Sequence, residues 1–274
     1  MTTIPFFLKS LSGRIFITSF QNTSERSDSV FILIPPIGEE MNKSRRMLAL
    51  MANQLAESGF NALIPDFHGT GDSEGDFSEA NLTMWHSDLD SLISWCGDEG
   101  YTKFNFLALR SGAVILLDYL SQRHTFEVDK VVLWHPMSTG DSWLTQFLRL
   151  RLAGGFSGNI EKETLKGLKT QLQVGEPLEV AGYELSAQFA NAIREINIAE
   201  ISPTSCEKLL WIDVVATEGR PILPASKKVI DHWEDSSFSI DSTVVVGPAF
   251  WSAVEIVDVD ALIDVTQAFV RAEG

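Results

Sequence analysis

The sequence has few cysteines and no long hydrophobic run. Its two cysteines, Cys96 and Cys206, are far apart, and it contains no Cys-x-x-Cys pair or Cys/His cluster. This pattern lacks the ligand spacing of zinc sites, so we expect no metal, no cofactor and two reduced thiols. The longest apolar stretch, residues 30–37, contains two prolines and is too short to cross a membrane.

Basic residues are also scarce. Lys and Arg number 21 against 37 Asp and Glu, which gives a net charge of −16. A surface this acidic repels nucleic-acid phosphates and anionic lipids, so we expect no nucleic-acid partner and no polybasic membrane attachment. No basic residue precedes the first apolar run, 4–8, and that run is shorter than the core of a secretory signal. These features predict a cytoplasmic protein.

The chain instead alternates short β-rich runs with helical patterns, which is typical of a mostly parallel sheet flanked by helices. We predict eight strands, over 6–8, 14–20, 30–34, 61–65, 103–109, 130–134, 208–215 and 243–247. The first two form an antiparallel pair around Ser12 and Gly13. The first helix is predicted over 43–58, because apolar residues recur at helical spacing from Leu48 to Leu55.

The alternation stops between residues 138 and 205, where glycines, two helical stretches and no clear strand are found. We interpret this region as a helical cap, inserted into a core made of residues 1–137 and 206–274. The strand order, with an excursion after the sixth strand, resembles that of a capped α/β-hydrolase. Residues 66–73 (D-F-H-G-T-G-D-S) resemble the D-x-R-G-x-G-x-S turn of the same superfamily, in which glycines permit positive φ angles.

The resemblance implies that a catalytic serine would stand in a G-x-S-x-G turn after strand 103–109. This sequence has A-L-R-S-G at 108–112, so Arg110 takes the nucleophile position. A guanidinium stays protonated and offers no lone pair. Ser111 is turned about 100° away along the following helix. It is a weak candidate nucleophile, and the alternative is a residue that only begins the helix.

The other two members of a Ser-His-Asp triad have poor matches. Phe250 and Trp251 stand where the resemblance places the histidine, and neither accepts a proton. Glu218 is the nearest match to the acid, with a solvated loop carboxylate as the alternative. His135, at the end of strand 130–134, is a candidate base, with a packing or capping role as the alternative. Two triad roles are therefore missing at the expected positions.

Gly38, Glu39 and Glu40 lie in the loop after strand 30–34, where active relatives stabilise an oxyanion. A cation at a helix N-terminus needs compensation, so Arg110 pairs with one of these glutamates in one hypothesis. In a second, Arg110 faces an open pocket and binds a carboxylate, phosphate or sulfated sugar. In a third hypothesis, Arg110 is a solvated arginine or one that is paired only for structural reasons. Trp251 is expected to line the same cleft.

Four segments together carry a closer resemblance: 35–47 (P-P-I-G-E-E-M-N-K-S-R-R-M), 108–112, 180–186 (V-A-G-Y-E-L-S) and 247–256 (G-P-A-F-W-S-A-V-E-I). They resemble the family called exosortase A system-associated hydrolase 2, over essentially the whole chain. This implies a context in the exosortase / PEP-CTERM protein-sorting and exopolysaccharide system, with its other components as possible partners. Two functions stay open: a ligand- or partner-binding accessory with a degenerate triad, or a hydrolase of an ester or acyl substrate with unorthodox groups, for example Ser111 with His135.

Overall fold

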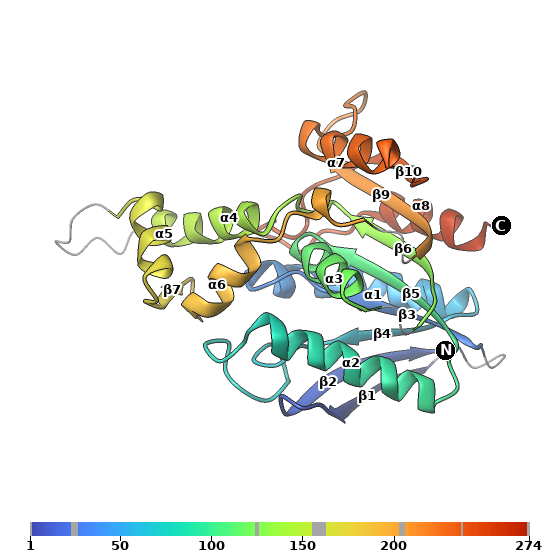
Figure 1. The fold of residues 1–274 in the computed structure, drawn as a ribbon. Coiled ribbons are helices and arrows are strands. Elements are labelled where there is room, and N and C mark those ends of the chain that lie inside the picture. Colours follow the sequence, from blue (N-terminus) through green and yellow to red (C-terminus); the bar gives the residue numbers. More distant parts are fainter. Residues whose placement is uncertain are drawn as a thin grey trace.

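The structure is a computed structural model that describes residues 2–22, 27–123, 126–154, 163–202, 206–236 and 238–272. Figure 1 shows its elements. The strands are β1 (Thr2–Lys9), β2 (Arg14–Gln21), β3 (Ser29–Ile34), β4 (Asn61–Pro65), β5 (Lys103–Leu109), β6 (Val128–Trp134), β7 (Leu178–Val180), β8 (Tyr183–Leu185), β9 (Cys206–Val215) and β10 (Asp241–Val246). The helices are α1 (Glu39–Glu57), α2 (Leu82–Asp98), α3 (Ser111–Ser121), α4 (Gly140–Ala153), α5 (Leu165–Gln173), α6 (Ala187–Arg194), the 3-10 helix η1 (Ile198–Glu200), α7 (Pro224–Asp235) and α8 (Asp260–Arg271).

The eight predicted strands form one sheet in the order β1-β2-β4-β3-β5-β6-β9-β10. β2 is antiparallel to both of its neighbours, and the other pairs are parallel. Every residue of β3 is buried, as expected for a central strand of a parallel sheet covered on both faces. The predicted eight-stranded, mostly parallel sheet is therefore confirmed.

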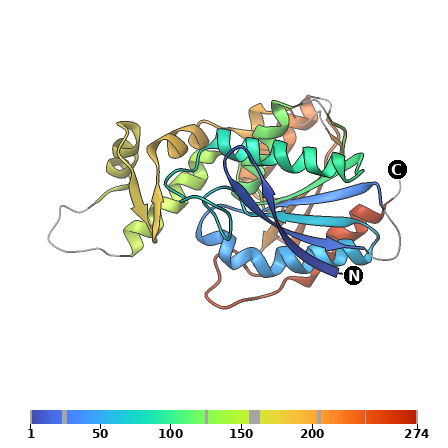
Figure 2. The same ribbon diagram turned by 90° about the horizontal axis from the view of Figure 1, so that it is seen from below.

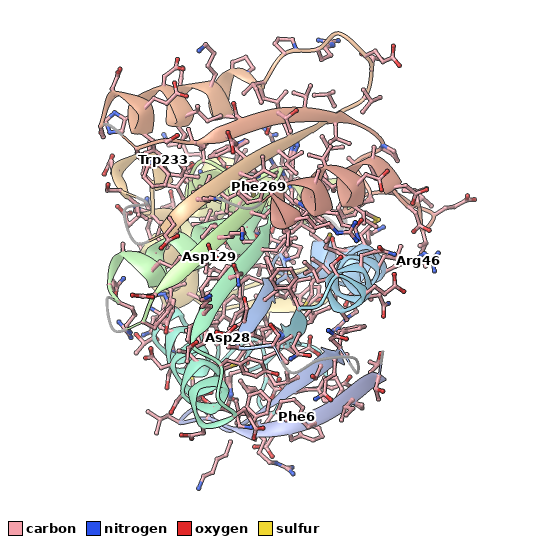
Figure 3. The ribbon with its side chains drawn as sticks, turned by 90° about the vertical axis from the view of Figure 1, so that its right-hand side faces the viewer. Phe6, Asp28, Arg46, Asp129, Trp233 and Phe269 are labelled. Carbon is pink, nitrogen blue, oxygen red and sulfur yellow. The ribbon has the colours of Figure 1, made fainter. Side chains whose placement is uncertain are left out.

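Helices cover both faces of the sheet (Figures 1 and 2). Apolar residues of α2, α3 and α7 pack in the core on one face, and those of α1 and α8 pack in a second core on the other. Figure 3 shows Phe6 of β1 and Trp233 of α7 at opposite ends of the sheet, and Arg46 and Phe269 on the two helices of the second face. Because both faces are covered, the central strand β3 is apolar at every position after Ser29.

The segment between β6 and β9 leaves the sheet and carries α4, α5, the β7–β8 hairpin, α6 and η1 (Figures 1 and 2). The expectation of no strand here is wrong, because β7 and β8 pair as an antiparallel hairpin. Each has only three residues, too few for a visible alternation. Parts of the predicted cap, 155–162 and 203–205, lie outside the described residues.

Helix α1 begins at Glu39, four residues before its predicted start at Lys43. Gly38, with φ 69°, precedes it and turns the chain from β3 into the helix. Carboxylates are favourable in a first helical turn, where they meet the positive end of the helix dipole. Glu39 and Glu40 are therefore helical residues, not loop residues, which fixes the direction of their side chains.

The first residue of α4, Gly140, leaves no room for a side chain. A Cβ atom there would overlap the carbonyl oxygen of Ile193 in α6. We expect Gly140→Ala to lower the free energy of unfolding by about 1–3 kcal/mol, since α4 and α6 would have to separate. Gly154→Ala, at the other end of α4, is the control, because its Cβ would meet its nearest atom at 3.4 Å. Urea unfolding checks both variants, and equal losses would contradict this packing argument.

Candidate functional site

The site forms at the turn between β5 and α3. Arg110 occupies this turn with φ 55° and ψ −119°, a strained conformation for a residue with a side chain. The turn stays tight because Gly112 packs against the end of β3, where a Cβ would come within 2.6 Å of two carbonyl oxygens. A strand, a strained residue and a helix follow one another here, as in a nucleophile elbow, with an arginine at its tip.

The Arg110 side chain is only 7% exposed and is held by three partners. Its Nη2 lies 3.0 Å from Glu40 Oε1 and donates to Gln146 Oε1 at 2.7 Å. Its guanidinium carbon stands 4.9 Å from the centre of the Trp251 ring, in cation–π geometry. The predicted pairing with a glutamate is confirmed for Glu40. The guanidinium is enclosed by its partners, so the hypothesis of an arginine facing an open pocket does not describe this structure.

The Arg110–Glu40 pair is largely removed from water. Burial raises the pKa of the Glu40 carboxyl, and the neighbouring Arg110 charge and hydrogen bond act in the opposite direction. The pair is nevertheless close enough to hold both charges. The cation at the start of α3 is thus compensated by a carboxylate on α1, and the centre of the site is electrically neutral.

Ser111 does not reach this centre. The residue is completely buried, and its Oγ accepts a hydrogen bond from the backbone N–H of Ile37 at 2.9 Å. The hydroxyl thereby ties the start of α3 to the loop after β3. Ser111 is the first residue of α3, in agreement with the helix-start alternative.

His135 follows β6 and has a positive φ of 43°. Its Nδ1 accepts a hydrogen bond from the Val214 N–H at 3.0 Å, so the neutral ring carries its proton on Nε2. Burial, followed by the charge of Arg110, lowers the pKa of His135 to about 3. The ring packs against Trp251 with 4.6 Å between the ring centres and 33° between the ring planes. An imidazole with its basic nitrogen occupied and so low a pKa is a poor general base near neutral pH.

The acid position has no carboxylate near the site. Glu218 is exposed in the turn after β9 and makes no ion pair or hydrogen bond within the described part of the chain. The buried carboxylate of this region is Asp213, on β9, which the sequence did not single out. It accepts hydrogen bonds from Trp211, Leu223 and Ser226, and therefore supports the local structure.

A pocket of about 360 Å³ lies beside the Arg110 cluster, between α1, α4 and the turn after β10. Its apolar lining consists of Ile37, Trp143, Phe147, Leu150 and Trp251. Its polar lining consists of Glu39, Glu40, Lys43, Gln146 and Ser252. This volume is in the range of small-molecule sites, and an apolar wall with a few polar groups is typical of them.

Solved structures match the chain along its whole length. Est1E from Butyrivibrio proteoclasticus with bound ferulic acid has a TM-score of 0.67 at 10% identity, covering 97% of each chain. The esterase Pf2001 of Pyrococcus furiosus has a TM-score of 0.64 at 13% identity, covering 98% of this chain and 90% of that one. The alpha/beta hydrolase GrgF from Penicillium has a TM-score of 0.64 at 16% identity, covering 99% of this chain and 98% of that one. The chain has the α/β-hydrolase fold. The sequence itself matches no family model and no curated protein.

Within this α/β-hydrolase fold, the predicted ligand-binding residues are only partly brought together. Glu39, Glu40 and Trp251 line the pocket. Gly38, Arg110 and Ser111 do not, because Gly38 lies against the Phe147 ring and the other two lie beneath the lining. Arg110 acts on the pocket through the side chains that it holds.

Helix α4 forms one wall of the pocket, and its Gln146 was not singled out from the sequence. Trp143, Gln146, Phe147 and Leu150 all line the pocket, and their spacing is i, i+3, i+4, i+7. This spacing places them on one face of a helix and is a signal present in the sequence. Among the described residues, no group of three or more His, Cys, Asp or Glu is arranged to hold a metal. No described helix is both long and apolar enough to cross a bilayer.

Proposed function

We propose that this α/β-hydrolase-fold protein has a degenerate Ser-His-Asp triad and binds a small ligand in the pocket beside Arg110. The observation that carries the proposal is the ion-paired Arg110 at the tip of the elbow. An arginine cannot attack a carbonyl carbon, and its Glu40 partner places a negative charge beside the site where an oxyanion would need stabilisation. The pocket is kept, whereas the nucleophile is not.

The competing function is hydrolysis of an ester or acyl substrate by Ser111, His135 and Glu218. The contacts of these residues favour binding over hydrolysis. The Ser111 hydroxyl is bonded to the Ile37 N–H, the His135 Nδ1 is bonded to the Val214 N–H, and Glu218 is exposed. A working triad needs nucleophile, base and orienting acid in contact with one another.

The cellular role proposed for this binding protein is that of an accessory in the exosortase / PEP-CTERM and exopolysaccharide system. The resemblance of segments 35–47, 108–112, 180–186 and 247–256 to the exosortase A system-associated hydrolase 2 family supports this role. A cytoplasmic location is part of the same proposal, and the net charge of −16 argues against nucleic acid as its partner.

Hydrolysis of short-chain p-nitrophenyl esters tests the proposal. We expect the purified protein to release no more nitrophenol than a heat-denatured sample, since neither Arg110 nor the buried Ser111 can act as a nucleophile. Any residual rate should be unchanged in Ser111→Ala. Turnover that is lost in a folded Ser111→Ala variant would instead establish the competing hydrolase function.

A further inference from the structure

A second pocket lies next to the first along α4. It has a volume of about 300 Å³ and lies between the end of α4 and the β7–β8 turn. Leu150 lines both pockets. The lining residues from α4 and its C-terminal cap are Trp143, Gln146, Phe147, Leu150, Arg151 and Gly154. Their spacing is that of one helical face, and they extend roughly 16 Å along the helix axis. We call the two adjacent pockets, which meet at Leu150, the α4 groove.

The cations that line the α4 groove are already bonded within the protein. Arg151 pairs with Glu163, with 2.9 Å between Nε and Oε2, and its Nη1 donates to the Glu179 carbonyl oxygen at 2.8 Å. Lys43 donates from Nζ to the Ala253 carbonyl oxygen at 2.7 Å. Arg110, below the lining, is paired with Glu40. An anionic ligand would have to break these bonds to find a counter-charge.

Two carboxylates of the lining form no ion pair in the described part of the chain, although the charge of Glu179 also acts on the neighbouring Arg151. Glu39 and Glu179 take part in no ion pair within the described ranges of the chain. Their charge, together with a net charge of −16, repels anions such as fatty-acid carboxylates. The electrostatics of the groove therefore select against a negatively charged ligand.

The groove exposes an apolar side chain where its two pockets meet. Leu150, which lines both pockets, is 41% exposed. Apolar surface left in water at the edge of an apolar groove marks a binding site for an apolar ligand.

We infer that the α4 groove binds a single-chain acyl compound with an uncharged polar head, for example a monoacylglycerol. This inference rests on the proposed binding function and specifies its ligand. In this inference the acyl chain of the ligand lies along α4 across Leu150. Its polar head lies among Gln146, Lys43 and Ser252, whose polar groups line the first pocket. The elongated shape of the groove fits a single acyl chain. Because the cations of the lining are already bonded within the protein, the groove favours an uncharged head over an anionic one.

Binding of a series of monoacylglycerols tests this inference. Monobutanoyl-, monooctanoyl- and monododecanoylglycerol are titrated below their micelle concentrations, with the fluorescence of Trp143 and Trp251 as the signal and calorimetry as the check. Each added methylene should lower Kd roughly threefold to fourfold until the groove is filled. Dodecanoate should bind at least about tenfold more weakly than monododecanoylglycerol, because its head is anionic.

Leu150→Asn should weaken binding of the longest compound about tenfold, since it puts a polar group between the two pockets. Val174→Asn is the matched control: Val174 is an exposed apolar residue after α5 that lines neither pocket, and its replacement should leave Kd unchanged. An affinity independent of chain length, or equal effects of the two variants, would overturn the inference and leave the proposed binding function standing. Release of dodecanoate from the bound ester would overturn the proposed function, while the ligand class would stand.

Discussion

Replacement of Arg110 by serine is expected to lower the free energy of unfolding by roughly 3 kcal/mol and to restore no esterase activity. Removing one partner of a buried ion pair leaves the other charge without compensation, which costs about 3–5 kcal/mol. The lower end applies because Glu40 keeps 21% of its side chain exposed. No activity returns, since Trp251 and the hydrogen-bonded His135 offer no base to the new hydroxyl.

A double-mutant cycle and a control variant separate the ion pair from a general loss of packing. Arg110→Ser combined with Glu40→Gln should lose less than the sum of the single variants, with a coupling energy of about 1–3 kcal/mol. Arg46→Ser is the control. Arg46 lies on α1, as Glu40 does, and forms an ion pair with Asp258, but its side chain is 54% exposed. Its loss should be much smaller than that of Arg110→Ser, because solvent screens an exposed ion pair. Urea unfolding is measured for the wild type, the two single variants, the double variant and Arg46→Ser, and additive losses would contradict the role of the pair.

The second large effect is a loss of stability in acid through His135. Its pKa is about 3 in the folded protein and 6.5 as the ordinary value. Between these values the unfolded chain binds a proton that the folded chain does not, so stability falls as the pH drops below 6.5. From pH 7 to pH 4 this one group should remove roughly 3 kcal/mol from the free energy of unfolding.

His135→Asn isolates this contribution. Asparagine tolerates a positive φ, and its Oδ1 can accept the Val214 N–H bond, yet it does not titrate. Denaturant unfolding at pH 7, 5.5 and 4 should show a smaller loss for this variant than for the wild type. His232→Asn, at an exposed histidine of α7, should retain the wild-type dependence. Parallel curves for the wild type and His135→Asn would disprove the assignment.

The main sheet could be predicted from the sequence because its strands are short apolar runs separated by helical spacing. β3 is buried at every position, and the corresponding run in the sequence contains only apolar residues after Ser29. The start of α1 was harder, because Glu39 and Glu40 are polar residues of a first turn and add nothing to the apolar pattern.

The candidate site could be predicted only as far as local sequence defines it. Arg110 at the elbow followed from residue type and position, whereas its pairing with a glutamate was one of three hypotheses that the sequence left open. The Gln146 contact joins the turn after β5 to α4, and the Trp251 contact joins that turn to the turn after β10. Such contacts depend on how a separate helix and a distant turn pack over the elbow, which no local pattern encodes.

Arg110 holds a carboxylate, an amide and an indole that come from three separate parts of the chain. Each partner fits a cation, so a serine placed at this position would meet neighbours unsuited to a nucleophile. On the proposed function, restoring catalysis would therefore take coordinated changes in three distant segments, whereas changes to the lining of the groove need no such coordination.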